Sequence, residues 1–190
     1  MKIKLDINTV AVKQLESAIW MFAYNYDEVA VHTVAGAAFE IYTKRLELSS
    51  FNEDIKKYIK PEKAKDFISL WNKPYNYFKH GEHQHKKIEI IEYDEETVEL
   101  IIYLAAEANL KGDERYRLSC ANIYRVHYAI KNPEFFEDAF YKRHFQNELK
   151  RLDISEELIK SKDSLRVWLN SADHTFLNGT NSPFRDVTSK

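Results

Sequence analysis

Residues 29–38 constrain the fold most strongly, because they read Val-Ala-Val-His-Thr-Val-Ala-Gly-Ala-Ala and are almost all small or apolar. Asp27 can cap a helix that contains this run, and we expect that helix to end near Leu46. A helix that is apolar on every side is a buried one. The small side chains of residues 35–38 would also let neighbouring backbones approach closely. The run therefore predicts a buried helix.

The rest of the chain also favours helices. Glycine and proline are scarce, at four each, which argues against a turn-rich β architecture. Capping residues and apolar spacing predict further helices over residues 8–24, 52–59, 61–72, 75–80, 94–112, 113–131, 134–151 and 155–171. Residues 82–93 are the least helical stretch, and a short extended segment fits them. We expect an all-α helical bundle of roughly six to eight helices.

Length and composition predict one domain. A chain of 190 residues suits a single core, which we place at residues 1–172, with a loop or disordered tail at 173–190. The 28 basic and 30 acidic side chains nearly cancel, so no overall charge attracts nucleic acid or an anionic membrane. Cys120 is the single cysteine, which excludes an intramolecular disulfide. With no signal peptide and no apolar run of membrane-spanning length, we expect a cytoplasmic protein without a membrane partner.

The sharpest local feature is the segment Trp-Asn-Lys-Pro-Tyr-Asn-Tyr-Phe-Lys-His at residues 71–80. On a helix, Asn76 and His80 share a face because they stand four residues apart. An amide and an imidazole in this arrangement can hold a hydroxyl or phosphate and move a proton near neutral pH. Lys79 lies beside that face and could neutralise a phosphate. The same residues could instead cap and solvate a helix end, or bind a ligand without any chemistry.

Two runs together carry a family resemblance. Thr-Val-Ala-Gly-Ala-Ala at residues 33–38, followed by Asn-x-x-Lys-His at residues 76–80, resembles a group of largely uncharacterised bacterial helical proteins. Their typical runs are Thr-Leu-Ala-Gly-Ala-Ala-Glu-Glu and then Ala-Arg-Asn-x-Leu-Lys-His. The second run is similar to the Arg-x-x-x-x-His signature of the HEPN superfamily (higher eukaryotes and prokaryotes nucleotide-binding). The resemblance covers residues 11–110 and fades afterwards.

This resemblance implies a dimeric helical bundle. In active HEPN ribonucleases, arginine and histidine from both subunits meet in a cleft and cleave RNA without a metal. By position, His80 would be the acid/base residue and Asn76 its polar partner, while Tyr75 occupies the arginine position. A tyrosine cannot supply the fixed positive fork of an arginine to a phosphate.

We therefore expect a non-catalytic homodimer that binds RNA, a nucleotide or a protein in bacterial defence, toxin–antitoxin pairing or regulation. The alternative is a metal-independent endoribonuclease that uses His80. In that case the cation would come from Lys79, or from Arg115 or Arg117 elsewhere in a dimer.

A metal site is a further alternative. His80, His83 and His85 form His-x-x-His-x-His, which could ligate zinc or another transition metal. The spacing is not a strong zinc signature, and no cysteine accompanies it. The sequence also has no Gly-x-Gly-x-x-Gly or phosphate-binding loop, and we expect no cofactor.

Two weaker patterns complete the candidate residues. Glu28 and His32 stand four apart, as in a di-iron bundle, but that pattern needs a second Glu-x-x-His pair, which the sequence lacks. We therefore expect His32 to be a hydrogen-bonded histidine in a packed helix, although the resemblance places it near the central helix pair.

Cations and aromatic rings also mix along residues 115–128, either as a surface for single-stranded nucleic acid or as an ordinary amphipathic face. They are Arg115, Tyr116, Arg117, Tyr124, Arg125 and Tyr128.

Overall fold

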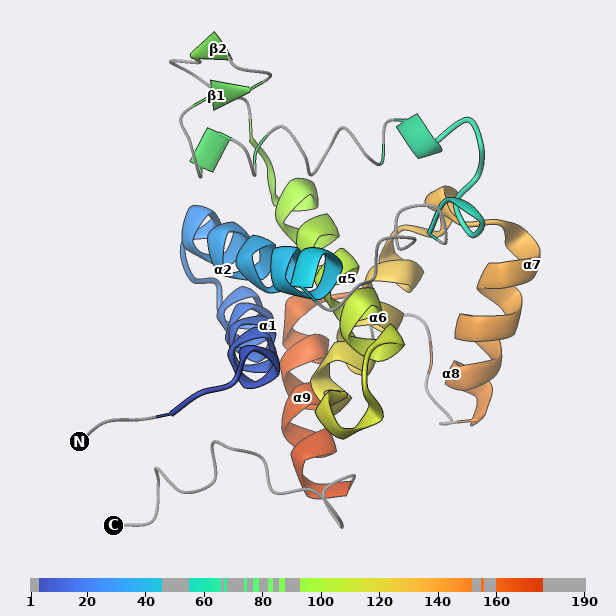
Figure 1. Cartoon of the computed structure of the whole chain (residues 1–190). Helices are drawn as coiled ribbons and strands as arrows, with labels where there is room; N and C mark the ends of the chain where they lie inside the picture. The colour runs from blue at the N-terminus through green and yellow to red at the C-terminus, as the bar shows by residue number, and fades with distance from the viewer. Residues whose placement is uncertain are drawn as a thin grey trace.

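The chain folds into an all-α helical bundle (Figure 1). The computed structural model describes residues 4–45, 55–65, 67, 74, 77–78, 82–83, 86–87, 93–151, 155 and 160–175. The α-helices are α1 (Ile7–Ala23), α2 (Glu28–Glu40), α5 (Glu95–Lys111), α6 (Ser119–Lys131), α7 (Asp138–Tyr141), α8 (Asn147–Arg151) and α9 (Lys162–Thr175). The all-α prediction is therefore confirmed.

Shorter elements join these helices. Two π-helical turns, η1 (Ile41–Arg45) and η4 (Lys142–Gln146), continue α2 and α7, and two 3-10 turns, η2 (Glu114–Tyr116) and η3 (Pro133–Phe135), precede and follow α6. In the described part of the chain, the strands are β1 (Glu82–His83) and β2 (Lys86–Lys87), which pair antiparallel over two residues each. No helix among the described residues is both long and apolar enough to cross a lipid bilayer.

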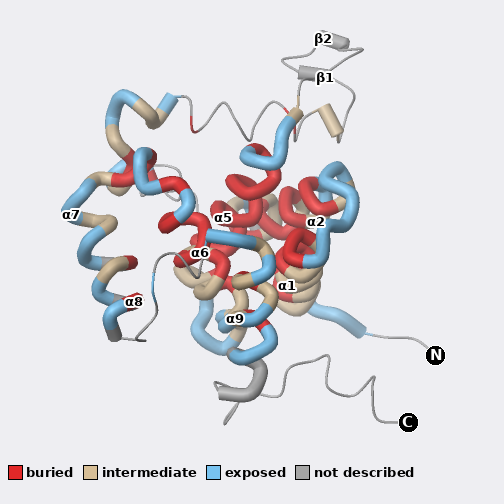
Figure 2. Tube along the Cα trace, turned by 180° about the vertical axis from the view of Figure 1, so that it is seen from behind, coloured by how far each residue is buried: buried red, intermediate tan, exposed pale blue. Residues whose placement is uncertain are grey.

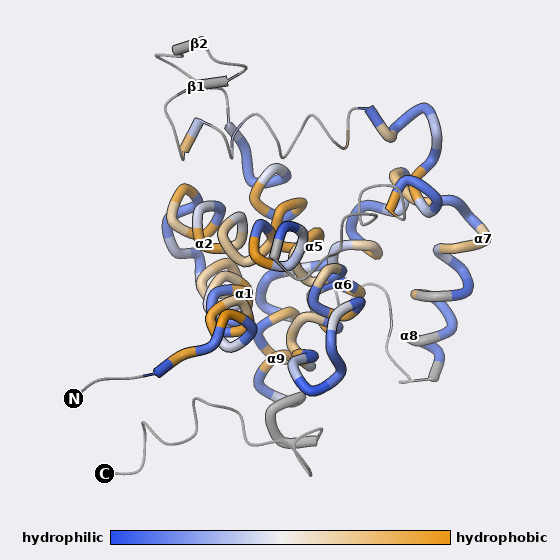
Figure 3. Tube along the Cα trace, viewed as in Figure 1, coloured by the Kyte–Doolittle hydropathy of each residue, from blue (hydrophilic) through white to orange (hydrophobic). Residues whose placement is uncertain are grey.

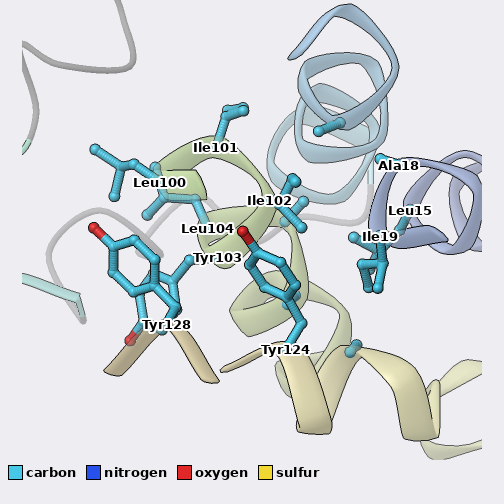
Figure 4. Close-up of a cluster of buried hydrophobic side chains, with 14 of the residues drawn as sticks. Leu15, Ala18, Ile19, Leu100, Ile101, Ile102, Tyr103, Leu104, Tyr124 and Tyr128 are labelled. Carbon is cyan, nitrogen blue, oxygen red and sulfur yellow. The ribbon is translucent and has the colours of Figure 1, made fainter. Parts of the chain in front are cut away.

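Helix α5 is the centre of the bundle. Every residue from 97 to 109 on it is buried, and Figure 2 shows this run in red between the other helices. Helices α1, α2 and α6 pack around it. Figure 3 shows hydrophobic stretches where these helices meet, and Figure 4 shows the side chains that fill the space. These include Leu15, Ala18 and Ile19 of α1, Leu100 to Leu104 of α5, and Tyr124 and Tyr128 of α6.

Helix α2 is less enclosed than its sequence predicts. Its inner face is buried and includes Val31, Ala35 and Phe39. Val29 and Thr33 are exposed on the other side, so the prediction of burial on every side is wrong. The reason is that α5, and not α2, takes the central place, which leaves α2 as an outer helix with one open face.

Aspartate caps begin the N-terminal helices and α5. As predicted, Asp27 accepts a hydrogen bond from the Ala30 N–H at 2.9 Å, and Asp94 accepts one from the Thr97 N–H at 2.9 Å. Helix α1 begins two or three residues earlier than predicted, because its cap is Asp6 and not Asn8 or Thr9. These caps are local signals, and they set where α2 and α5 begin at the same end of the bundle.

The predicted helix from Asp113 is wrong at its start. Asp113 caps the 3-10 turn η2, and α6 begins only at Ser119. The side chain of Asn109 explains the difference, since it donates to the Tyr116 carbonyl at 2.8 Å and accepts from the Leu118 N–H at 2.9 Å. These bonds hold residues 116–118 outside a helix.

The C-terminal half also differs from the predicted ranges. The predicted helix over 134–151 begins at Asp138, because residues 135–137 bond to residues 58–60, including an isolated bridge between Ile59 and Phe136. Helix α9 starts later than the predicted residue 155 and runs past the predicted residue 171 to Thr175. Residues 176–190 of the predicted tail, and the isoleucines of the predicted extended segment, lie outside the described residues.

Candidate functional site

One described residue of the sequence motif, Phe78, contacts α2 and the start of α5. Of residues 75–80, the described residues are Tyr77 and Phe78. The Phe78 ring meets the His32 ring edge-on, with centroids 5.3 Å apart, and meets the Tyr93 ring edge-on at 4.8 Å. Phe78 therefore packs against α2. The candidate residues Tyr75, Asn76, Lys79 and His80 lie outside the described residues.

His32 is fully enclosed. Its exposed fraction is 0%, and among the described residues neither ring nitrogen has a hydrogen-bond partner. Its ring also meets Tyr93 edge-on, with centroids 5.6 Å apart. Burial lowers the pKa of His32 from 6.5 to about 4. The prediction that His32 is buried is confirmed. The prediction that it is hydrogen-bonded is wrong within the described part of the chain, where the contacts of its ring are with the aromatic rings of Phe78 and Tyr93.

The burial of His32 limits the chemistry that its ring can perform. Burying a polar group without a hydrogen bond costs about 1–3 kcal/mol. The imidazole is neutral at physiological pH, so it can neither supply a positive charge to a phosphate nor donate a proton as an acid there. It can hydrogen-bond to a group that reaches it only if Phe78 or Tyr93 moves aside.

Tyr93 ties the start of α5 to the first turn of α2. Its hydroxyl donates to the Glu28 carbonyl at 3.1 Å. Burial raises the pKa of Tyr93, and the nearby carboxylates of Glu28, Asp94 and Asp27 raise it further. Those same carboxylates make this corner of the bundle electronegative, which disfavours a phosphate there.

The described residues contain no cluster of side chains that could bind a metal ion. Among these, no group of three or more histidine, cysteine, aspartate or glutamate side chains converges on a metal position. His83 lies in β1, where it pairs with Lys86, and both His80 and His85 lie outside the described residues. The histidine triplet therefore stays a prediction.

Sequence reasoning missed a buried polar strip between α5 and α6. Lys131 Nζ lies 2.5 Å from Glu99 Oε1, and Arg125 Nη1 lies 3.8 Å from Glu107 Oε1. Glu107 also hydrogen-bonds to the Tyr103 side chain. Burial raises the pKa of both glutamates, and their cationic partners act in the opposite direction.

The sequence contains a spacing pattern that is consistent with this strip, but the pattern is ambiguous. Glu99, Tyr103 and Glu107 recur every four residues and so share one face of α5. On its own, that spacing is typical of a solvated face. Only the packing of α6 turns it inward, and the strip fixes how α6 lies on α5 rather than forming an open site.

Arg115 and Arg117 lie in the connection between α5 and α6, and not on the predicted helix. Arg115 Nη2 lies 2.5 Å from Asp113, and Arg117 Nη1 lies 3.1 Å from Glu114. Tyr124 and Tyr128 are buried, and Arg125 lies over the Phe145 ring at 5.4 Å. The mixed face therefore does not form as one surface, because its tyrosines from α6 belong to the core. A role for Arg115 and Arg117 in binding stays a prediction.

Comparison with models of protein families, with curated proteins and with solved structures finds no match for this chain.

Proposed function

We propose that this chain is a HEPN-like helical protein that acts as a homodimer by binding a protein partner, and that it does not cleave RNA. The setting that fits is bacterial defence, toxin–antitoxin pairing or regulation. The observation that carries the proposal is the edge-on contact between His32 and Phe78. His32 directly precedes the run at residues 33–38, and Phe78 lies between Asn76 and His80 in the sequence, so the contact links one residue beside the first run to one residue within the second.

The chemistry of this corner supports binding over catalysis. Tyr75 stands where the resemblance requires an arginine. The described histidine at the corner, His32, has a pKa of about 4 and is neutral under physiological conditions. A metal-free ribonuclease needs a cation for the phosphate and a group that exchanges protons near neutral pH. His32 supplies neither of these functions.

The charge of the corner supports a protein partner over RNA. Asp27, Glu28 and Asp94 surround the hydroxyl of Tyr93 closely enough to raise its pKa. Phosphates bind where lysine and arginine gather, and affinity for RNA depends on that attraction. A protein segment can instead offer positive charge to these carboxylates.

The proposal is tested by two measurements on the full chain. The first incubates a mixture of structured and single-stranded RNA with wild type and with His80→Ala, and follows cleavage on gels. We expect intact RNA in both reactions. Cleavage by wild type that His80→Ala abolishes would overturn the proposal in favour of the endoribonuclease.

The second measurement is affinity purification from the native bacterial host, with light scattering to give the mass of the purified protein. We expect a homodimer and a stoichiometric protein partner, which Asn76→Ala and His80→Ala reduce. Asn147→Ala is the matched control because Asn147 is exposed on α8. A monomer without a stoichiometric partner, or equal retention by all variants, would contradict the proposal.

A further inference from the structure

The turn between α1 and α2 exposes large apolar side chains. The exposed fractions are 48% for Tyr24, 61% for Tyr26 and 43% for Val29. This turn has a defined shape, because the Asn25 N–H donates to the Phe22 carbonyl at 3.1 Å and the Tyr26 N–H donates to the Met21 carbonyl at 3.0 Å. Asn25 has a φ of 56°, a left-handed conformation that asparagine tolerates better than most residues. The backbone therefore holds this turn in one shape with the rings of Tyr24 and Tyr26 in solvent.

Carboxylates border these apolar side chains. Asp27 and Glu28 are exposed in the same turn, and Asp94 and Glu96 are exposed at the start of α5. The hydrogen bond from Tyr93 to the Glu28 carbonyl brings the two helix starts together. Within the described part of the chain, none of these four carboxylates makes an ion pair. Asp27 and Asp94 cap α2 and α5, so the side chains of Glu28 and Glu96 are the ones that can pair with a cation of a partner.

The chain's own helix α9 already places cations on aromatic rings at this end of the bundle. Lys162 Nζ lies 4.2 Å from the centre of the Phe22 ring and 3.1 Å from Glu95. The Arg166 guanidinium lies 5.7 Å from the centre of the Tyr24 ring. These contacts combine a cation, a ring and a carboxylate, an arrangement that is favourable in partly desolvated positions. The Tyr26 ring has no such cation among the described residues.

We propose that Tyr24, Tyr26, Asp27, Glu28 and Val29, here called the acidic aromatic patch, bind a segment of a partner protein that carries lysine or arginine beside apolar side chains. The cation lies over the Tyr26 ring and pairs with Glu28, and an apolar neighbour covers Val29. This inference rests on the proposed function for the existence of a protein partner, and it adds the surface and the chemistry of that partner. It does not use residues 75–80.

The charge of the acidic aromatic patch favours this occupant. A nucleic acid offers bases that could stack on Tyr26, but its phosphates would meet the carboxylates of Asp27 and Glu28. An acidic protein segment meets the same repulsion. A basic segment gains from both the rings and the carboxylates, and such charge complementarity speeds association and excludes wrong partners.

The test uses a fluorescein-labelled peptide of alternating arginine and leucine, titrated with the full chain and followed by fluorescence anisotropy. An alternating glutamate and leucine peptide and a single-stranded RNA are titrated in parallel. We expect the basic peptide to bind at physiological salt and the other two not to bind. Tyr26→Ala and Glu28→Lys should each weaken binding by about tenfold or more, as expected for residues at the centre of a contact.

Glu62→Lys is the matched control. Glu62 is an exposed glutamate that closely follows the residues bonded to residues 135–137, and its charge reversal should leave binding unchanged. Circular dichroism establishes that each variant is folded, and Glu28→Gln replaces Glu28→Lys if the latter is not. Equal binding by all variants, no binding of the basic peptide, or preferred binding of RNA would overturn the inference.

Two outcomes separate this inference from the proposed function. If the homodimer dissociates in Tyr26→Ala, the patch is covered by a second copy of this chain and the inference is wrong. If the native partner is retained by Glu28→Lys but lost by His80→Ala, the proposed function survives and the acidic aromatic patch is not its surface.

Discussion

The side-chain nitrogen of Asn109 donates to the Tyr42 hydroxyl at 2.9 Å, and this bond joins the last turn of α5 to the π-helical turn that follows α2. Both residues are almost fully buried. The same amide group bonds to the backbone of Tyr116 and Leu118. One side chain therefore connects the end of α5, the turn that follows α2 and the connection that leads to α6.

Replacing Asn109 with leucine should destabilise the fold. The change leaves a buried hydroxyl, a carbonyl and an N–H without their partner, and we expect a loss of about 2–4 kcal/mol in the free energy of unfolding. Urea denaturation measures this loss. Asn147→Leu, at an exposed position, should stay within about 0.5 kcal/mol of wild type. A loss for Asn109→Leu no larger than that control would contradict the structural role of this amide.

Replacing His32 with leucine should change how stability depends on pH. The pKa of His32 is about 4 in the folded chain against 6.5 when exposed, so the unfolded chain binds a proton that the folded chain rejects. The free energy of unfolding is therefore unaffected by His32 protonation above pH 6.5. It falls by roughly 2–3 kcal/mol as the pH falls toward about 4.

His32→Leu lacks this dependence, and at neutral pH it should be as stable as wild type or more stable, because it removes an unbonded polar group. Urea denaturation of both proteins across this pH range isolates the contribution of His32. Parallel pH profiles for the two proteins would show that the ring is not enclosed as described.

Removing Phe78 should open the corner around His32. With one of the two enclosing rings absent, water reaches the imidazole, and its pKa should rise from about 4 toward 6.5. NMR titration of the histidine ring protons in Phe78→Ala measures this change. Phe140→Ala, which removes a ring that packs on Tyr58 and Phe145, serves as the control and should leave the His32 pKa unchanged. An unaltered pKa in Phe78→Ala would mean that Phe78 does not close the site.

The pair of Arg125 and Glu107 should be strongly coupled. Arg125→Met leaves the Glu107 carboxylate buried without its cation, and we expect a loss of about 3–5 kcal/mol at neutral pH. Arg125→Met combined with Glu107→Gln should recover much of that loss. Because burial raises the pKa of Glu107, the defect of Arg125→Met should shrink as pH falls and the carboxyl group becomes protonated. Additive losses in the double variant would argue against an interaction between the two side chains.

Local signals in the sequence predicted much of the fold. Asp27 and Asp94 begin their helices because a cap needs only the next three residues, and the all-α class follows from the scarcity of turn residues. The start of α6 was not predictable in this way, since the side chain of Asn109 overrides the capping capacity of Asp113.

The candidate site depended on contacts between distant segments. The sequence singled out His32 and the segment around Phe78 separately, and no spacing rule indicates that their rings touch. The buried glutamates of α5 were missed for the same reason, because Glu99 and Glu107 acquire their partners only when α6 packs on α5. The acidic aromatic patch was not predicted, because the packing of the helices decides which side chains stay exposed.

The enclosure of α5 also limits when the protein can fold during its synthesis. Helices α1 and α2 leave the ribosome before α5, but α6 follows it, and α9 packs against both α1 and α6 from the end of the chain. A nascent chain that has just released α5 still exposes the apolar side that α6 will cover. Completion of the core must therefore wait until α9 has left the ribosome, and chains that stall before that point would be targets for chaperones and proteases.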